Sequence, residues 1–478
     1  MTRRRFLENT ALASASLVAP KSIWTWEREF DVVILGGRVI DPESRLDGVR
    51  NLGVRNGKIA MVTEQRISGK TTIEAAGKVV CPGFIDPISH GQDLQNDEVQ
   101  ILDGVTTKLQ LEAGVPDVDA WYKAQAGNRI CNYGAGTGHG RARAFLFGEG
   151  EEANAKVATS QDIEKMAEFL DTQLGQGAIA VGFGLEYEPS STRMEVLEMF
   201  RVAGQFKASC HCHVRYGTVF DDQSELVGIA EVMAASVASG APLHIVHVPS
   251  MGLSKTQDAL TLIERAQARG FDVTCDFYPY TAFGTGIDTE VFAEGWQSRF
   301  GIDYGDLEWA KTHERLTKES FENYRAEGGM VLAHAIPESA VIAALKSPAS
   351  MVGSDGGLED GVGHPRSSGT YCRILGRYVR EQHVVSLGAA IEKMTLRPAL
   401  RMQGRCADFK KKGRIQAGAD ADIVVFDPAT VIDRATFEEP ARTSLGMEWV
   451  LVGGQIAVKN GKLNEGLRPG TGLRSHTK

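Results

Sequence analysis

Short apolar segments of β-strand length alternate with amphipathic helical segments through the middle of the chain. The strand-like segments are Ala178–Val181, Ala208–His213, Leu243–His247, Val273–Asp276, Val331–His334 and Met351–Gly353. Helices are expected between them, among them one that begins at a capping box formed by Thr192 and Glu195. This alternation predicts a parallel sheet covered by helices, and its length favours a closed α/β barrel, (β/α)8, over an open sheet.

Both ends of the chain are rich in short β-hairpins instead. Asn56-Gly57 and Asn460-Gly461 are typical two-residue hairpin turns between apolar segments. We therefore expect residues 28–80 and 412–465 to fold together into one small composite β-sandwich domain, and residues 81–411 to form the barrel. The polar, aromatic-bearing stretch 283–329 interrupts the barrel pattern, and it is either a lid or a helix pair on the surface.

The composition of the chain argues against nucleic acid, membrane and disulfide-scaffold classes. The 478 residues carry a formal net charge of -9, without a basic stripe interleaved with aromatic residues, so we expect no nucleic-acid partner. No apolar run is long enough to span a bilayer, so no membrane partner is expected. The seven cysteines are scattered, which indicates buried thiols and not a disulfide scaffold.

Residues 1–27 differ in kind from the rest of the chain. Thr2-Arg3-Arg4-Arg5-Phe6-Leu7 precedes a mildly apolar stretch, Ala11 to Ala19, and then Pro20. This order resembles a twin-arginine export signal. It predicts an exported protein, periplasmic or extracellular; the alternative is a basic N-terminal tail.

Five polar residues, each at the end of an apolar strand, indicate the chemistry. They are His90, Glu112, His213, His247 and Asp355. The strand that ends toward His90 is expected over Val79–Asp86. The C-terminal ends of parallel strands converge on one mouth of a barrel, so these side chains are expected to meet there. Imidazoles and carboxylates hold divalent metals and move protons beside them, which predicts a metal-dependent hydrolase.

The local patterns around these residues leave alternatives open. Along Cys210–His213, strand alternation puts His211 and His213 on the barrel side and both cysteines toward the helices; a Cys-x-Cys metal site would need the opposite orientation. Asp355 lies between a buried strand and a glycine turn, a placement that suits a general base. An Asx turn or a helix N-cap is the structural alternative for Asp355.

Several motifs resemble those of the amidohydrolase superfamily, namely Cys81-Pro82-Gly83-Phe84-Ile85-Asp86, Gly104-Val105-Thr106-Thr107 and Gly353-Ser354-Asp355-Gly356. Asp276–Thr281 and His364–Thr370 are similar, more narrowly, to the N-acyl-D-amino-acid deacylase branch, the D-aminoacylases. The resemblance runs from about Phe30 to Arg474. It implies a distorted (β/α)8 barrel, a composite β-sandwich and zinc-assisted hydrolysis of the amide bond of N-acyl amino acids, particularly D isomers.

Two positions depart from the family pattern. The first strand usually ends in His-x-His, where this chain has Ile88-Ser89-His90, and the branch commonly has a metal-bridging Cys where this chain has Glu112. Ile cannot ligate a metal, whereas a carboxylate oxygen is a good zinc ligand. The resemblance therefore implies one metal ion, Zn2+ or another divalent metal, held by Glu112, His213 and His247 with water in the fourth position. Asp355 would be the general base. His90 would contact the ligands or the substrate, or hold a weak second metal.

The sequence gives weaker evidence for the residues that bind the substrate. Candidates are Arg215, Tyr187, Tyr280, His139, Arg366 and Ser368. Arg215 is expected to share the barrel-facing side of His213 and to bind a carboxylate, and His139 lies in a glycine-flanked loop expected to reach the mouth. A structural or surface role is the alternative for each. Alternative functions are a dipeptidase, a deacetylase, a cyclic-amide or lactone hydrolase, or a non-catalytic metal-binding homologue.

Overall fold

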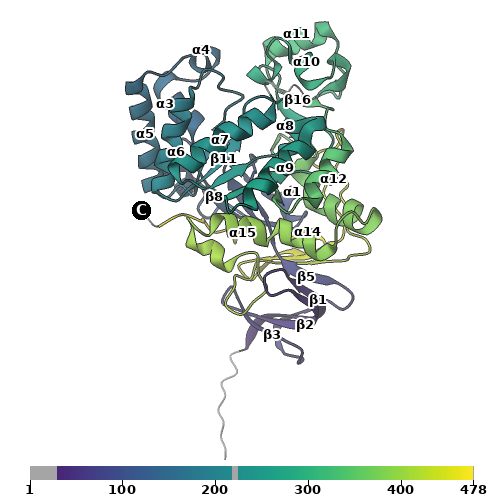
Figure 1. The fold of residues 1–478 in the computed structure, drawn as a ribbon. Helices are drawn as coiled ribbons and strands as arrows, with labels where there is room; N and C mark the ends of the chain where they lie inside the picture. Colours follow the sequence, from purple (N-terminus) through teal and green to yellow (C-terminus); the bar gives the residue numbers. More distant parts are fainter. Residues whose placement is uncertain (1–28, 218–223, 477–478) are drawn as a thin grey trace, which may run out of the picture.

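Within residues 29–217 and 224–476, the part of the chain that the computed structural model describes, eight parallel strand positions form a closed barrel (Figure 1). The strands in spatial order are β6 (Phe84–Asp86), β7 (Val105–Gln110), β8 (Asn132–Ala135) with β9 (Thr137–Gly138), β10 (Ala180–Gly184), β11 (Ser209–His213), β12 (Leu243–Ile245), β13 (Val273–Phe277) and β17 (Ser350–Val352). Only Gly136 separates β8 from β9, so the two occupy one position. The predicted fold class is confirmed.

The barrel closes between its last and first strands. The amide of Asp355 donates to the carbonyl oxygen of Ile88 at 2.8 Å, and Ser89 forms a parallel bridge with Gly356. The buried carboxylate of Asp86 accepts from the amide of Ser354 at 2.9 Å. These contacts bring the segment that follows β17, which carries Asp355, beside the segment that carries His90.

Amphipathic helices cover the outside of the barrel, as the alternating pattern predicts. The longer ones are α1 (Leu94–Ile101), α2 (Val118–Gln125), α3 (His139–Phe147), α5 (Ser160–Gly175), α6 (Arg193–Gln205), α7 (Glu225–Ser239), α9 (Thr256–Gln267), α12 (Glu338–Lys346), α13 (Arg366–Arg373), α14 (Leu387–Met394) and α15 (Leu396–Met402). Thr192 and Glu195 form the expected capping box of α6. Cys210 and Cys212 are buried in the apolar layer between strands and helices, as strand alternation predicts.

The two chain ends share one nine-stranded sheet, which lies at the lower end of the molecule in Figure 1. Its strands are β1 (Phe30–Asp41), β2 (Leu46–Arg55), β3 (Lys58–Thr63), β4 (Gly69–Glu74), β5 (Val79–Pro82), β20 (Ile423–Phe426), β21 (Met447–Val452), β22 (Gln455–Lys459) and β23 (Lys462–Leu463). Antiparallel pairing of β5 with β20 joins the halves. The Asn56-Gly57 and Asn460-Gly461 turns have the positive φ angles that two-residue hairpins need.

Two predicted strands differ from the structure. The segment 79–86 is not one strand but two, because Gly83 separates β5 of the composite sheet from β6 of the barrel. Residues 331–334 do not form a barrel strand. Instead β16 (Met330–Ala333) pairs antiparallel with β14 (Phe283–Gly286) and β15 (Leu307–Trp309), in a small sheet of the inserted segment. Strand periodicity is the same in both sheets, so it could not distinguish them.

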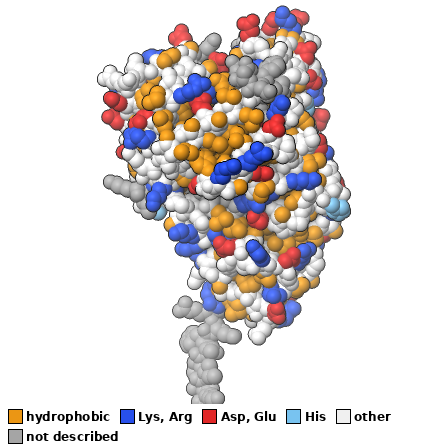
Figure 2. All heavy atoms as spheres, viewed as in Figure 1, with side chains coloured by type: hydrophobic (Ala, Val, Ile, Leu, Met, Phe, Trp, Pro, Cys, Tyr) orange, Lys and Arg blue, Asp and Glu red, His pale blue; other side chains and the backbone are white. Residues whose placement is uncertain are grey.

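This small sheet, with α10 (Trp296–Phe300) and α11 (Lys318–Glu327), makes the inserted segment a separate layer at the upper end of the molecule in Figure 1. On the face shown in Figure 2, Lys and Arg side chains are interspersed with Asp, Glu and apolar ones. Among the described residues, no helix is long and apolar enough to cross a membrane. The predicted export signal, residues 1–27, lies outside the described residues.

Candidate active site

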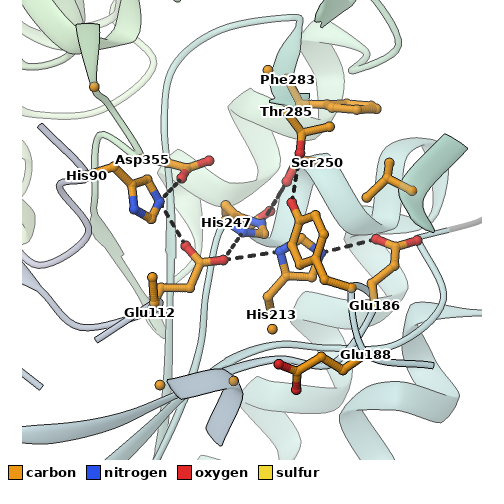
Figure 3. Close-up of a pocket in the computed structure, with 18 of the residues that line it drawn as sticks. His90, Glu112, Glu186, Glu188, His213, His247, Ser250, Phe283, Thr285 and Asp355 are labelled. Carbon is orange, nitrogen blue, oxygen red and sulfur yellow. Dashed lines mark hydrogen bonds and ion pairs between the residues drawn. The ribbon is translucent and has the colours of Figure 1, made fainter. Parts of the chain in front are cut away.

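A cavity of about 480 Å³ lies at the C-terminal ends of the barrel strands. All five strand-end residues of the sequence prediction, His90, Glu112, His213, His247 and Asp355, contribute to its wall (Figure 3). The barrel therefore brings together residues that lie up to 265 positions apart in the sequence.

Glu112, His213 and His247 converge on one point. Glu112 Oε1 lies 3.1 Å from His213 Nδ1 and 3.2 Å from His247 Nε2, and all three side chains are buried. His213 ends β11, whereas His247 follows β12 in the left-handed region, with a φ of 34°. The Asp276 carboxylate accepts from the His247 amide at 2.7 Å and so supports this backbone conformation.

A divalent cation fits this donor set. Ligand atoms bound to a tetrahedral zinc at about 2.0–2.1 Å lie roughly 3.3 Å from each other, close to the two separations observed here. Burial would lower the pKa of His213, but the hydrogen bonds and charges of Glu112 and Glu186 outweigh it and raise that pKa to about 9. The site is thus strongly favourable for positive charge, and its three residues are of the types that ligate metals.

The two histidines are oriented by contacts on their far sides. His213 Nε2 lies 3.1 Å from Glu186 Oε2, and His247 Nδ1 lies 2.8 Å from Ser250 Oγ. Such partners fix the ring orientation of metal-ligating histidines and leave the other nitrogen free to ligate.

Asp355 and His90 lie on the opposite side of Glu112 (Figure 3). His90 Nε2 is 3.0 Å from Asp355 Oδ1 and 3.3 Å from Glu112 Oε2. Burial would raise the pKa of Asp355, but the nearby Arg366 guanidinium and other positive charges outweigh it and hold that pKa below its usual value. Asp355 is therefore a carboxylate near neutral pH, the protonation state that a general base needs.

Two of the six substrate-binding candidates line the cavity. Arg366 lies in its wall with its guanidinium over the Tyr278 ring, and its Nε has no hydrogen-bond partner among the described residues. The Tyr187 hydroxyl lies 3.0 Å from Thr285 Oγ1, and its ring centroid is 4.8 Å from that of His213.

The structure does not bring the other four candidates to the cavity. Arg215 pairs with Glu231 and donates to the carbonyl of Ser191, so its guanidinium points toward the helices and not into the barrel mouth. His139 does not lie in a loop: it begins α3, fully buried between Glu188 and Glu195.

Tyr280 and Ser368 also differ from the prediction. The Tyr280 hydroxyl donates to the carbonyl of Pro365 at 3.2 Å, and Ser368 is completely buried within α13. Neither lines the cavity formed by the described residues. In both cases the residue lies two positions from a cavity residue, Tyr278 or Arg366, but its side chain is buried outside the cavity wall.

Several cavity residues had no strong sequence signal. They are Glu186, Glu188, Ser250, Tyr278, Phe283, Thr285 and Met330. Glu186 directly precedes Tyr187, and Ser250 follows His247 by three residues, so proximity to a predicted residue was the available clue. The contribution of the inserted segment depends on its fold over the barrel, which no local pattern encodes.

Comparisons with known proteins agree with this geometry. An N-acyl-D-glutamate deacylase from Alcaligenes xylosoxydans xylosoxydans is 29% identical over 481 residues, which cover 90% of this chain and 93% of the relative. The structure of N-acyl-D-glutamate deacylase from Bordetella bronchiseptica, complexed with zinc and a phosphonate inhibitor that mimics the tetrahedral intermediate, matches with a TM-score of 0.80 and 27% identity. The match covers 94% of this chain and 100% of the Bordetella bronchiseptica chain.

A further solved structure is that of a D-aminoacylase with a binuclear metal centre, described in terms of one-metal activation and second-metal attenuation. It matches with a TM-score of 0.78 and 26% identity, and covers 93% of this chain and 100% of that one. The profile of the amidohydrolase family matches residues 137–458, about two-thirds of the sequence. Together with the barrel, the composite sheet and the buried ligand set, this match establishes that the chain belongs to the amidohydrolase family.

Proposed function

We propose that this protein is a metal-dependent hydrolase that removes the acyl group from N-acyl amino acids, particularly those of D configuration. The observation that carries the proposal is the convergence of Glu112, His213 and His247 beside Asp355 in one cavity. The deacylase relatives support the substrate class and its configuration.

We further propose that Glu112, His213 and His247 hold a single tightly bound Zn2+. When bound, the ion polarises the amide carbonyl and lowers the pKa of water. Ile88, where the family has a histidine, is completely buried among apolar side chains. His90, Glu112 and Asp355 form a second possible cation group. The Arg366 guanidinium, 2.9 Å from Asp355, opposes a second cation there by like-charge repulsion.

Asp355 is the proton carrier in this proposal. Its carboxylate accepts a proton from the attacking water and later delivers it to the departing amine. His90 hydrogen-bonds to Asp355 Oδ1 and Arg366 pairs with Oδ2, so both carboxylate oxygens are held in a fixed orientation. The two contacts favour the ionised form that begins the reaction.

Arg366 is positioned to bind the substrate carboxylate, because its guanidinium lies in the cavity wall and its Nε has no hydrogen-bond partner among the described residues. Guanidinium groups are well suited to bind carboxylates. Its Nη2 donates to the carbonyl of Gly284, so this carboxylate would lie beside the inserted segment. The wall there is apolar, formed by Phe283, Val291, Phe300 and Met330. We therefore expect an apolar amino-acid side chain.

The test is a substrate panel on the zinc-loaded protein. N-Acetyl and longer N-acyl derivatives of D- and L-phenylalanine, leucine and glutamate are incubated with it, together with a dipeptide, a lactone and a cyclic amide. Released amine is measured, or released acid for the lactone and the cyclic amide. Hydrolysis of the D-phenylalanine or D-leucine derivatives in preference to their L isomers and to D-glutamate supports the proposal. No release from any acyl amino acid, with hydrolysis of a dipeptide, lactone or cyclic amide, would replace it by one of those activities.

We also propose that the protein is exported through the signal-like segment 1–27. The arginine pair Arg3-Arg4 ahead of Phe6-Leu7 supports this destination. The seven cysteines are all free and buried, which is compatible with export of a chain that has already folded.

A further inference from the structure

We propose that Glu186 is a positioning residue that fixes the proton of His213 and thereby sets the metal affinity of the site. This inference rests on the proposed function, in which His213 is a metal ligand. Glu186 itself does not belong to the proposed ligand set, and it lies on the far side of the imidazole ring from Glu112 (Figure 3).

The His213 ring is held between two carboxylates. Its Nδ1 is 3.1 Å from Glu112 Oε1, and its Nε2 is 3.1 Å from Glu186 Oε2. Both carboxylates can only accept, but Glu112 would be engaged by the ion, so Glu186 would remain the acceptor for the ring proton, which then belongs on Nε2. Nδ1 is then the nitrogen with a free lone pair, and that lone pair faces the metal site.

The other oxygen of Glu186 is already committed to two donors. Glu186 Oε1 accepts from the Gly217 amide at 3.2 Å, and Arg299 Nη1 lies 3.4 Å away from it. The Glu186 side chain is 6% exposed, so water offers little replacement for these contacts. Three donors therefore converge on two oxygens, and only a carboxylate has acceptors on both sides.

Residues 186 and 187 connect His213 to the inserted segment. Arg299, the partner of Glu186, lies on α10, where its Nη2 donates to the carbonyl of Val291 at 2.8 Å. Tyr187, the residue after Glu186, contacts both the His213 ring and Thr285 of β14. Two consecutive residues, Glu186 and Tyr187, thus contact His213 on one side and the cavity wall on the other. This double connection keeps the Glu186 carboxylate in place.

Replacement of Glu186 by Gln gives a direct prediction. A carboxamide has one acceptor and one donor end, and two donors, Gly217 and Arg299, compete for the acceptor. The amide NH2 group is then directed at His213 Nε2, which forces the ring proton onto Nδ1, where it blocks the metal. Loss of such a partner typically costs roughly 10- to 100-fold in metal affinity, and we expect a decrease in this range.

The experiment measures zinc affinity directly, by titrating the metal-free full-length protein against a chromophoric chelator. Substitution of Co2+ provides a second readout, because the visible spectrum reports the ligand geometry. The matched control is Glu308→Gln. Glu308 is equally buried and contacts two histidines, His334 at 2.9 Å and His313 at 3.4 Å, and one arginine, Arg315, at 3.6 Å. It does not line the cavity. Its substitution should leave zinc affinity and the Co2+ spectrum unchanged.

Arg299→Leu separates the Glu186–His213 contact from the placement of the inserted segment. It removes a partner of Oε1 and leaves the Oε2 contact intact, so zinc affinity should change by less than about threefold, well below the effect of Glu186→Gln. An equal loss in both variants would overturn the inference, and so would wild-type affinity in a folded Glu186→Gln protein. If Glu186→Gln does not fold, Glu186→Asp keeps both acceptors but retracts them, and should weaken zinc binding to an intermediate degree.

Failure of the proposed function gives a different result. His213→Ala with wild-type zinc affinity would show that His213 is not a ligand, and would remove the basis of both proposals. Loss of zinc binding in His213→Ala, together with wild-type zinc affinity in Glu186→Gln, would contradict only the role of Glu186.

Discussion

Arg366 Nη1 lies 2.9 Å from Asp355 Oδ2, and both side chains are almost completely buried in the wall of the same cavity. Residue 366 begins a helix and residue 355 follows a barrel strand, so the pair joins the substrate-binding wall to the proposed general base. The charge of Arg366 keeps the Asp355 carboxylate ionised, and its Nε has no hydrogen-bond partner among the described residues.

Arg366→Lys tests the proposed carboxylate contact. Lysine keeps the positive charge near Asp355 but cannot bind a carboxylate bidentately, so we expect KM to rise by about tenfold or more with a smaller change in kcat. Arg373→Lys is the matched control. Arg373 lies on the same helix, stacks over Tyr280 and pairs with Asp433 at 2.9 Å, but lies outside the cavity wall, so its variant should keep the wild-type KM.

Asp355→Asn tests the proton carrier. The amide keeps the size of the side chain but cannot accept a proton, and we expect kcat to fall by roughly 10²- to 10⁴-fold with metal content and melting temperature little changed. Asp433→Asn, which alters the similar pair with Arg373, should keep near-normal turnover. Near-normal turnover in Asp355→Asn itself would assign the proton to another group.

The ligand set is tested by metal content after identical dialysis. Glu112→Ala, His213→Ala and His247→Ala should each lose the ion, because each removes one of three protein ligands. His90→Ala should keep most of the ion and lose activity, since Ile88 provides no second histidine and His90 contacts Asp355 at 3.0 Å. If His90→Ala empties the site while Glu112→Ala does not, the ion lies nearer the first strand.

The number of bound ions and their effect on the stability of the folded protein can both be measured. Elemental analysis is expected to find close to one tightly bound ion per chain, and two retained ions would contradict the proposed single site. Adding the ion back at 100 times its Kd should stabilise the folded protein by about 2.7 kcal/mol, measured as a rise in the melting temperature of the metal-free protein. The Glu112→Ala protein should show a much smaller rise.

Export is tested by cell fractionation. Changing Arg3 and Arg4 together to Lys keeps the charge of residues 1–27 but removes the arginine pair, so we expect the variant to accumulate inside the cell while the wild-type chain is exported. Changing Lys410 and Lys411 to Arg in the exposed part of the folded chain serves as a control for altered basic residues, and should not affect export. Equal distribution of variant and wild-type chains would contradict the proposed signal.

The sequence by itself determined the barrel and the positions of the five strand-end residues. Strand and helix periodicities are local properties, and the C-terminal ends of parallel strands must converge once a barrel forms. For this reason Glu112, His213, His247, Asp355 and His90 could be predicted to meet, although the chain between them is long. The hairpin turns at Asn56-Gly57 and Asn460-Gly461 were predictable for a similar reason, because only a few residues favour positive φ.

Tertiary structure alone decided which neighbouring side chains share the cavity. Arg215 and Arg366 are both arginines close to a predicted site residue, yet Glu231 draws the first toward the helices while the second faces the cavity. Glu186 likewise contacts Arg299, which lies more than a hundred positions away on the inserted segment. Local sequence fixes the direction of a strand and its alternating faces, but a charged side chain takes the orientation in which its partners satisfy it, and those partners are brought close only by the packing of distant segments.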